Sequence, residues 1–181
     1  MASEPVIRVS GLSKSFGGRP VLRQVGLEVK RGETVVLMGG SGCGKSTFLW
    51  LLLGLYPPDE GSIQVLGTDV VHADAEEVAR VRRRVGVLFQ SGALYNSMTV
   101  GENLALPLRE HSDLDDGLIR MVVKMKLELV GLRDFEHLMP SQLSGGMKKR
   151  VGLARALVLD HEILLYDEPT TGLDPIMGDV I

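Results

Sequence analysis

The chain has 181 residues, of which 44% are hydrophobic and 24% charged, a composition that supports one globular domain with its own core. The net charge of −3 gives no electrostatic reason to expect a nucleic-acid partner. The longest unbroken apolar run is far too short to span a bilayer, so a membrane link is expected only through a partner. The lone Cys43 excludes an internal disulfide and suits a reducing compartment.

Strand patterns dominate the first part of the chain. Residues 5–16, 18–33 and 61–70 alternate apolar and polar side chains between glycine turns, which is typical of half-buried strands. Pro57 and Pro58 precede the third of these segments. We therefore expect a β-rich region beside an α/β centre.

A glycine-rich segment, GGSGCGKST at residues 39–47, follows an apolar run over 34–38. Glycine clusters often mark flexible turns, and that alternative applies to any such string taken alone. Here the spacing matches G-x-x-x-x-G-K-[ST], the run over 34–38 predicts a buried strand, and residues 46–55 predict a helix. A strand, a loop and a helix in this order indicate a cradle for nucleotide phosphates.

Each position of this loop has an expected role. Backbone N–H groups surround the anion at the positive end of the helix, where side chains with a Cβ would obstruct the approach. Lys45 is expected to reach the β and γ phosphates, Ser46 to bind Mg²⁺ and Thr47 to hold the α-phosphate side. The other cofactor-binding positions are the loop residues Gly39, Gly40, Ser41, Gly42, Cys43 and Gly44. Kinases, GTPases and transport ATPases share such a loop, so the use of the nucleotide stays open.

A basic cluster stands before the next predicted strand and consists of Arg80, Arg82, Arg83 and Arg84. A nucleic-acid contact is one interpretation, but the acidic total favours a solvated face. The strand is predicted over residues 83–90, a second apolar run of the buried type. Gln90 at its end is expected to reach a metal ion or a water molecule.

A helical insert is predicted after this strand. Ser112 and Asp115 have the spacing of a capping box, and Gly131 is the expected stop signal. Apolar side chains recur between them at helical spacing, namely Leu114, Leu118, Met121, Met125 and Leu129. This stripe is expected to pack into the core.

A third apolar strand, within HEILLYDE at residues 161–168, ends in two adjacent acids. Because side chains alternate along a strand, we expect Asp167 to face Mg²⁺ and Glu168 to face the γ-phosphate and an attacking water. Glu168 would act as the general base or orient that water, which Gln90 could also reach. The alternative is an ordinary Asp-Glu-Pro turn, which the upstream phosphate loop disfavours.

The segment LSGGMKKRVGLARAL at residues 143–157 predicts a second anion site. Ser144, Gly145 and Gly146 form a compact helix start that is rich in N–H groups. The helix is expected to bury a stripe made of Val151, Ala154, Leu157 and Val158. One domain does not need two sites for one γ-phosphate, so the second is expected to serve a nucleotide held by another copy.

Over residues 6–180 the chain resembles the nucleotide-binding domains of ABC transporters. The motifs stand in that family's order: the Walker A loop at 39–47, the Q-loop at Gln90, the signature LSGGM at 143–147, the Walker B strand at 163–168 and the D-loop at 172–174. The resemblance implies an α/β P-loop NTPase of the ABC ATPase type. It further implies a single domain over 1–181, with a β-rich N-terminal subdomain and an inserted helical lobe at about 91–158.

The resemblance also implies cofactors and catalytic roles. ATP and Mg²⁺ are the expected cofactors, with the metal held through Ser46, Gln90 and Asp167. Glu168, Gln90 and Lys45 are the expected catalytic residues.

Further residues follow from the ATP sandwich of this family, in which each nucleotide lies between the phosphate loop of one copy and the signature of the other. Phe16 is expected to stack on adenine, where the family more often has Tyr, and a buried core Phe is the alternative. Asp174 is expected to help position the partner's site. Hydrolysis would reopen the dimer and drive a membrane partner.

A finer resemblance points to the ATPase subunits of Mla or Mce-type lipid transporters. Most signatures continue with Gln, whereas here the glycines are followed by Met147, Lys148, Lys149 and Arg150. Residues 90–111 and 164–176 agree with this subtype. It implies phospholipid or other lipid transport across a bacterial envelope, with a permease gripped by residues 91–140 and an Mce-type substrate-binding protein as partners. The chain would be cytoplasmic and peripheral on the inner membrane.

Other functions remain open at this point. They are an ABC importer or exporter ATPase for another substrate, a soluble ABC ATPase acting on DNA or ribosomes, and a non-hydrolysing regulatory module. Soluble members usually have a long coiled-coil insertion or two fused halves, and the sequence has neither. Glu168 disfavours the regulatory module.

A last expectation concerns the switch histidine of the ABC family. In the ABC family a switch histidine follows the Walker B glutamate by roughly thirty residues and contacts the γ-phosphate. Here the sequence ends at Ile181 and its histidines all precede Glu168. We therefore expect a C-terminally truncated chain with weak ATPase activity.

Overall fold

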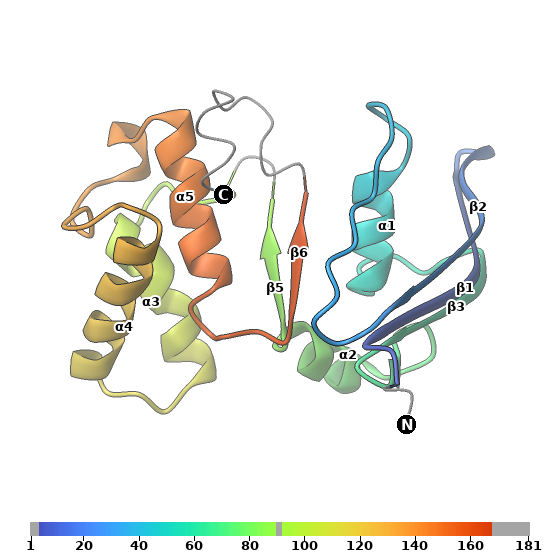
Figure 1. Cartoon of the computed structure of the whole chain (residues 1–181), viewed down its shortest axis with the longest axis horizontal. Helices are drawn as coiled ribbons and strands as arrows, with labels where there is room; N and C mark the ends of the chain where they lie inside the picture. Colours follow the sequence, from blue (N-terminus) through green and yellow to red (C-terminus); the bar gives the residue numbers. More distant parts are fainter. Residues whose placement is uncertain (1–3, 90–91, 168–181) are drawn as a thin grey trace. The chain divides into compact units, whose positions relative to one another are not determined.

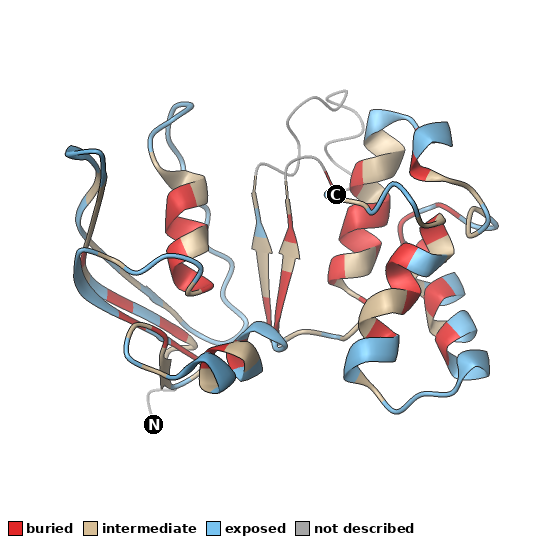
Figure 2. Ribbon diagram, turned by 180° about the vertical axis from the view of Figure 1, so that it is seen from behind, coloured by how far each residue is buried: buried red, intermediate tan, exposed pale blue. Residues whose placement is uncertain are grey.

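The computed structural model describes residues 4–89 and 92–167. The chain divides into two compact units, Met1–Arg82 and Arg83–Ile181 (Figure 1). Each unit has its own buried side chains, and the two are taken in turn below (Figure 2).

The first unit is built on a four-stranded antiparallel sheet with the order β2-β1-β3-β4. Strand β1 (Ile7–Phe16) pairs with β2 (Arg19–Val29) on one edge and with β3 (Glu60–Val65) on the other, and β3 pairs with β4 (Thr68–Asp69). The register sets Val9 opposite Leu27 in β2 and opposite Ile63 in β3. The strands predicted from alternation are confirmed.

Helices α1 (Lys45–Leu52) and α2 (Ala75–Arg82) complete the first unit, α1 against β3 and α2 against β4. The alternation of β1 and β3 buries one face of the sheet, because successive side chains of a strand point to opposite faces. The core comprises Ile7, Val9, Leu12, Ile63 and Val65 from these strands with Phe48, Leu51 and Leu52 from α1.

The arginine cluster predicted as a solvated face is exposed, but some of its members also make specific contacts, among them a 3.8 Å ion pair of Arg80 with Glu77. Arg82 donates from Nε to the carbonyl of Leu53 at 2.7 Å and from Nη2 to that of Gly54 at 2.8 Å. These carbonyls end α1 and have no partner in the helical ladder, so Arg82 serves as their cap. In the second unit Arg84 pairs with Glu162 at 2.6 Å.

The apolar run over 34–38 forms no strand, so the prediction of a buried strand there is wrong. Val36 is 73% exposed and Met38 is 90% exposed. A strand with apolar side chains on both faces needs neighbouring strands for its N–H and C=O groups and covering layers on both sides. Within the first unit the sheet β2-β1-β3-β4 does not include this run. Hydrophobicity alone therefore does not make it a strand.

The second unit combines a parallel strand pair with helices. Strand β5 (Val85–Leu88) pairs with β6 (Ile163–Tyr166), which confirms the predicted second and third buried-type strands. The helices are α3 (Val100–His111), α4 (Asp116–Leu129), the 3₁₀ turn η1 (Pro140–Gln142) and α5 (Gly145–Ala156).

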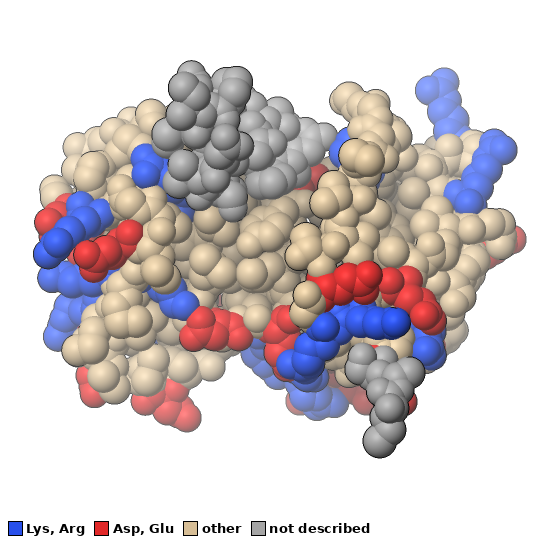
Figure 3. All heavy atoms as spheres, in the orientation of Figure 1, with Lys and Arg blue, Asp and Glu red and all other residues tan. Residues whose placement is uncertain are grey.

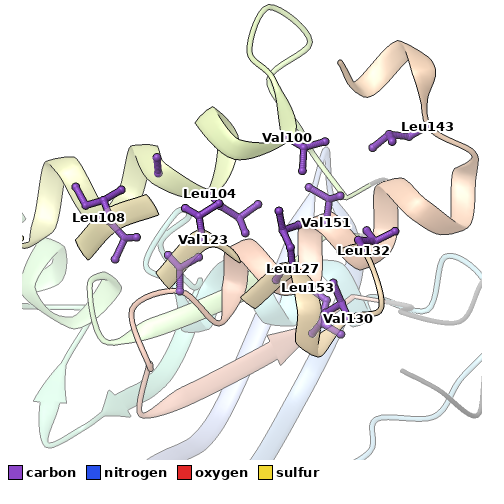
Figure 4. Close-up of a cluster of buried hydrophobic side chains, with 14 of the residues drawn as sticks. Val100, Leu104, Leu108, Val123, Leu127, Val130, Leu132, Leu143, Val151 and Leu153 are labelled. Atoms are coloured by element: carbon purple, nitrogen blue, oxygen red, sulfur yellow. The ribbon is translucent and has the colours of Figure 1, made fainter. Parts of the chain in front are cut away.

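One hydrophobic cluster holds the helices of the second unit together (Figure 4). Its members come from α3, α4, α5 and the segments between them, and β5 contributes Leu88. The most deeply buried are Val100, Leu104, Leu127, Val151 and Ala154. Buried aliphatic contacts of this kind supply most of the stability of such a helical layer.

The start of α3 is a capping box that sequence reasoning missed. The Thr99 hydroxyl accepts from the Glu102 backbone N–H at 3.2 Å, and Glu102 accepts from the Thr99 N–H at 2.7 Å. The hydrogen bond from the Thr99 backbone N–H lowers the pKa of the Glu102 carboxyl. The pattern Thr-x-x-Glu before an apolar run is visible in the sequence and predicts this helix start.

The predicted capping box of Ser112 and Asp115 is wrong, because the two residues serve different helices. Ser112 ends α3, and its hydroxyl donates to the Leu108 carbonyl at 2.6 Å. Asp115 starts α4 and accepts from the N–H groups of Gly117 and Leu118 at 2.7 and 3.0 Å. The three-residue spacing of Ser112 and Asp115 therefore arises because the end of α3 and the start of α4 lie close together in the sequence.

The stripe of α4 expected to pack into the core is exposed instead, so this prediction is also wrong. The residues that α4 buries are Ile119, Val123 and Leu127. They recur every four residues, and thus form their own continuous face of the helix. Because α4 carries apolar side chains on two faces, periodicity could not choose which one packs inward. Gly131, the expected stop, follows the helix with a positive φ of 68°.

Candidate functional site

The glycine-rich loop ends at a residue that only glycine suits. Gly44 has φ 101°, a left-handed conformation, and helix α1 begins directly after it with the Phe48 N–H donating to the Gly44 carbonyl at 2.9 Å. A Cβ at Gly44 would lie 2.9 Å from Cγ1 of Val21 and 3.1 Å from Cδ2 of Leu22. The helix predicted after the loop is confirmed, and the loop packs on the strand β2.

Lys45 places its charge inside the loop. The ammonium donates to the carbonyls of Gly39 at 2.9 Å and Gly40 at 3.1 Å. No side chain caps the N-terminus of α1 within the described residues, so its positive end is left to backbone N–H groups. A fixed cation beside a helix N-terminus fits a phosphate group, as the loop motif predicts.

The predicted base-stacking residue has an aromatic neighbour. Phe16 at the end of β1 is 41% exposed, so the alternative of a buried core Phe does not hold. The ring of Tyr56 stands edge-on to it at a centroid distance of 6.0 Å and 88°. The ammonium of Lys14 lies 5.5 Å from the Phe16 centroid. Tyr56 was not foreseen, although an aromatic residue directly before two prolines is visible in the sequence.

Asp59 anchors the cluster formed by Phe16, Tyr56 and Lys14. It accepts from Nζ of Lys14 at 2.8 Å and from the Ser15 N–H at 2.6 Å, and the Pro57 carbonyl accepts from Lys14 at 2.8 Å. The hydrogen bond from Lys14, followed by that from Ser15, lowers the pKa of the Asp59 carboxyl. The end of β1 that carries Phe16 is therefore tied to the segment that carries Tyr56.

The acidic end of the third strand is well defined up to Asp167. Leu88 lies opposite Tyr166 in the parallel pair, and the Asp167 N–H donates to the Leu88 carbonyl at 2.9 Å. Both strands thus end at the same edge of the sheet, where parallel α/β proteins place polar ligands. Gln90, Glu168 and Asp174 lie outside the described residues.

The expected Mg²⁺ is compatible with the donors that the sequence supplies. Among the residues described, no group of three or more His, Cys, Asp and Glu side chains is arranged to hold a metal ion. Mg²⁺ is usually bound by one or two protein oxygens together with phosphate oxygens and waters. The hydroxyl of Ser46 in the first unit and the carboxylate of Asp167 in the second are oxygen ligands of that kind.

The predicted second anion site starts a helix, as expected. Ser144 is the N-cap of α5, and its hydroxyl accepts from the Met147 N–H at 3.3 Å. A Cβ added at Gly145 would meet no atom within 4 Å, so the first turn is open to an approaching group. Val151, Ala154 and Val158 are buried, which confirms most of the predicted stripe, and Leu157 is partly buried.

The unusual residues after the signature glycines have a structural role. Arg150 donates from Nη1 to the Val130 carbonyl at 3.0 Å and to the Gly131 carbonyl at 3.3 Å, which caps the end of α4. Lys149 is buried. The basic run Lys148 to Arg150 is therefore partly built into the helical layer.

Sequence reasoning missed the contact that holds the segment after Gln90 on α5. A Cβ at Gly152 would lie only 2.9 Å from the Cα of Gly92. Arg155, one turn further on, donates to the carbonyls of Ala93 at 2.8 Å and Gly92 at 3.1 Å. Burial lowers the pKa of its guanidinium. A glycine inside a helical pattern is the signal for such a close approach.

His161 beside this helix predicts a dependence of stability on pH. Burial lowers its pKa below the ordinary 6.5, and the Ala156 carbonyl, 2.7 Å from Nδ1, and Asp160 only partly oppose this. The unfolded chain therefore takes up the proton at a higher pH than the folded chain. We expect the free energy of unfolding to decrease as the pH falls through 6.5 toward the folded pKa.

The matched variant is His161→Asn, whose amide can still donate to the Ala156 carbonyl. Urea unfolding at pH steps below 6.5 should give a flatter profile for this variant than for the parent chain. If the free energy of unfolding changed equally with pH in the two proteins, His161 would not be the cause of the pH dependence.

The sequence matches a known family and known proteins. The model of the ABC transporter family matches residues 22–171. The probable ribonucleotide transport ATP-binding protein mkl of Mycobacterium leprae is 51% identical over 170 residues, which cover 94% of this chain and 49% of that protein. The intermembrane phospholipid transport system ATP-binding protein MlaF of Haemophilus influenzae is 45% identical over 179 residues, 99% of this chain and 68% of that protein.

Solved structures of ABC ATPases match the fold of this chain. The ATP-binding cassette MJ0796, solved as a post-hydrolysis dimer with ADP and Pi, matches with a TM-score of 0.89 and 33% identity over 97% of this chain and 79% of that one. The fold is therefore that of an ABC ATPase cassette, as predicted. The chain spans 49% of the length of the first relative. Along the described residues, no helix has the length and apolarity needed to cross a membrane.

Proposed function

The chain belongs to the ABC transporter family, and from that premise we propose that it binds ATP with Mg²⁺ and hydrolyses the ATP to power a membrane transporter. The observation that carries this proposal is the phosphate loop, in which a left-handed Gly44 starts α1 and the Lys45 ammonium lies among the loop carbonyls. This arrangement places a cation at the N-terminal end of a helix, where backbone N–H groups point toward an anion.

Each residue of the site has its own proposed role. Lys45 and the backbone of residues 39–47 hold the phosphates, and Phe16 stacks on the base. Ser46, Gln90 and Asp167 would hold Mg²⁺, which would supply positive charge to offset that of the phosphates. Glu168 orients the attacking water and accepts its proton. The exposed ring of Phe16 supports its role, because a stacking residue must present a face to the base.

A second copy of the chain completes each site in this proposal. Ser144, Gly145 and Gly146 of one copy contact the γ-phosphate held by the other, and Asp174 helps to position the partner's site. The open first turn of α5 supports this role. The related cassette MJ0796 has been solved as a dimer.

Replacing the base tests the dimer and the chemistry together. We expect Glu168→Gln to keep ATP binding, to lose hydrolysis by about 1000-fold and to accumulate an ATP-bound dimer, because removal of the base leaves both anion sites intact. Light scattering with and without ATP measures the mass, and phosphate release measures turnover. Monomers alone in the presence of saturating ATP would contradict the sandwich.

The transported substrate is proposed to be phospholipid or another lipid of the bacterial envelope. The relationship to MlaF supports this, and the signature continuation Met147 to Arg150 agrees with it. Ribonucleotide transport is the second candidate, because mkl, with 51% identity, is described as a probable ribonucleotide transport protein. Stimulation of ATPase activity in the complex reconstituted with its permease, by phospholipid or by ribonucleotides, distinguishes the two.

A groove in the second unit is proposed to receive a cytoplasmic helix of the permease. It has a volume of about 540 Å³ and lies between α3 and α4, with Ala105, Ile119 and Val123 among its apolar residues. A helix laid in an apolar groove is a common recognition mode. An Mce-type substrate-binding protein would complete the transporter, and the chain would be cytoplasmic and peripheral on the inner membrane.

No nucleic-acid partner is proposed. Basic and acidic side chains are intermingled on the face drawn in Figure 3, without a broad continuous basic area. Nucleic-acid binding depends on such an area, because affinity comes largely from neutralised phosphates.

A further inference from the structure

Tyr56 in the first unit lies beside the ring of Phe16 and is itself exposed. The two ring centroids are 6.0 Å apart and the ring planes stand at 88°, which is the edge-to-face arrangement that aromatic pairs favour. Both side chains keep contact with solvent, with 41% of Phe16 and 45% of Tyr56 exposed. Burial in the core therefore does not explain why Tyr56 stands at this place.

Tyr56 also forms a ring pair with the helix that follows the phosphate loop. The rings of Tyr56 and Trp50 lie 5.9 Å apart and at 48° to each other. Trp50 belongs to α1, which starts at Lys45 directly after the loop. Tyr56 thus links, ring to ring, the residue proposed to stack on the base with the helix whose start is proposed to hold the phosphates.

The segment that carries Tyr56 is bound on both sides of it. The Leu55 N–H donates to the Trp50 carbonyl of α1 at 2.9 Å, and the Asp59 N–H donates to the Ser13 carbonyl of β1 at 2.9 Å. Two prolines follow Tyr56 directly, and they fix their own φ angles and restrict Tyr56 to extended backbone. The exposed ring of Tyr56 is therefore carried by a short segment with little conformational freedom.

Phe16 has few other means to fix the orientation of its ring. A phenylalanine has no polar atom for a hydrogen bond, and two glycines follow Phe16, so no side chain of the next residues braces it. Among the residues that the structure describes, its aromatic and cation–π neighbours are Tyr56 and the ammonium of Lys14, which lies 5.5 Å from the Phe16 centroid. Tyr56 is thus the aromatic ring that restricts the plane of Phe16.

Such a restriction matters because ATP must engage two places at once. Its base meets the ring of Phe16 while its phosphates meet the loop before α1, and the covalent length of the nucleotide sets the separation between them. A ring that rotates freely loses that freedom on binding, which lowers affinity. A ring whose plane is already fixed relative to α1 loses less.

We infer, on the basis of the ATP binding proposed above, that Tyr56 is a positioning residue for the nucleotide. It holds the ring of Phe16 in the orientation that stacks on the base, at a fixed place relative to α1 and the phosphate loop. Tyr56 acts through its ring and through Phe16. Its hydroxyl is not required, and Tyr56 does not stack on the base itself.

Isothermal titration calorimetry of the full chain with Mg-ATP and with Mg-tripolyphosphate tests this role. The second ligand has the three phosphates and no base, so it reports on the loop alone. We expect Phe16→Ala to weaken ATP binding about tenfold and Tyr56→Ala about fivefold, with the tripolyphosphate affinity unchanged in both. Adding Tyr56→Ala to Phe16→Ala should cause no further loss, because the two rings act as one unit.

Two matched variants separate the ring from the rest of the segment. Tyr56→Phe keeps the ring and removes the hydroxyl, and we expect it to bind ATP like the parent. Leu55→Ala shortens the neighbouring side chain, which is 49% exposed, and we expect no change there either. Weaker ATP binding by Tyr56→Phe, or a loss in Leu55→Ala equal to that in Tyr56→Ala, would overturn the inference.

The variant Tyr56→Ala can itself contradict the inference in three ways. These are an unchanged ATP affinity, an equal loss of ATP and tripolyphosphate affinity, and a further loss in the Phe16→Ala background, which would mean that Tyr56 contacts the base directly. If Tyr56→Ala lowers the thermal midpoint by more than about 5 °C, Tyr56→Leu takes its place, because it keeps an apolar side chain without a ring. Parent-like ATP affinity in Tyr56→Leu then counts against the inference.

The same titrations distinguish a failure of this inference from a failure of the proposed function. If Lys45→Ala weakens the binding of both ligands while Tyr56→Ala changes neither, only the role of Tyr56 is wrong. If the parent binds neither ligand, or Lys45→Ala leaves both affinities unchanged, the proposed phosphate site is wrong and the role of Tyr56 falls with it.

Discussion

Lys45→Ala is expected to weaken ATP binding by about 100-fold, which corresponds to ~3 kcal/mol. The ammonium lies within 2.9 Å of the Gly39 carbonyl and 3.1 Å of the Gly40 carbonyl, so it is held where the loop surrounds an anion. Removing it takes away a charge-assisted donor to the phosphates and leaves the loop carbonyls facing them. Isothermal titration calorimetry with Mg-ATP measures the loss.

The matched control is Lys30→Ala, which removes an exposed lysine of the same unit at the end of β2. Both variants lower the net charge equally, so a difference between them cannot come from long-range attraction of the nucleotide. We expect the Lys30 variant to bind like the parent. If Lys45→Ala does so as well, the loop is not the phosphate site.

Gly152→Val is expected to destabilise the second unit by about 3 kcal/mol. An added Cβ would lie 2.9 Å from the Cα of Gly92, 3.0 Å from its carbonyl oxygen and 3.0 Å from Cδ1 of Leu88. Two of these atoms are backbone, so relief requires α5 and the segment that starts at Gly92 to move apart. The same movement would stretch the bonds from Arg155 to Gly92 and Ala93.

Gly145→Val is the control for the cost of valine in this helix. It is also a glycine of α5, but an added Cβ there meets no atom within 4 Å. Urea unfolding followed by circular dichroism at 222 nm gives the free energy of unfolding of each variant. A loss at Gly152 no larger than that at Gly145 would mean that the close packing of Gly152 does not contribute.

Local chemistry made much of the site predictable. The loop motif names Gly44 and Lys45 because a phosphate cradle needs a left-handed turn and a cation at a helix start, and both depend on a few consecutive residues. Ser144 as a helix cap depends on the same short range. The strands β1, β2 and β3 were predictable from alternation because one face of their sheet is buried.

Periodicity failed where more than one face of an element is apolar. On α4 the residues Ile119, Val123 and Leu127 form one apolar face, and Met121 and Met125 lie on another. Both satisfy the helical period, and the burial of one depends on α3 and α5, which are distant in sequence. The error concerned the choice between faces, because a single sequence does not specify which neighbours a helix meets.

Pairing and close approach were likewise decided by distant residues. An apolar run such as 34–38 becomes a strand only where another strand supplies its hydrogen bonds. The sequence does not predict that Gly152 packs against Gly92. It also does not predict that Arg155 donates a hydrogen bond to the carbonyl of Ala93. Short-range geometry is encoded by consecutive residues and can be read along the chain, whereas burial and contact depend on which surfaces meet when the core forms.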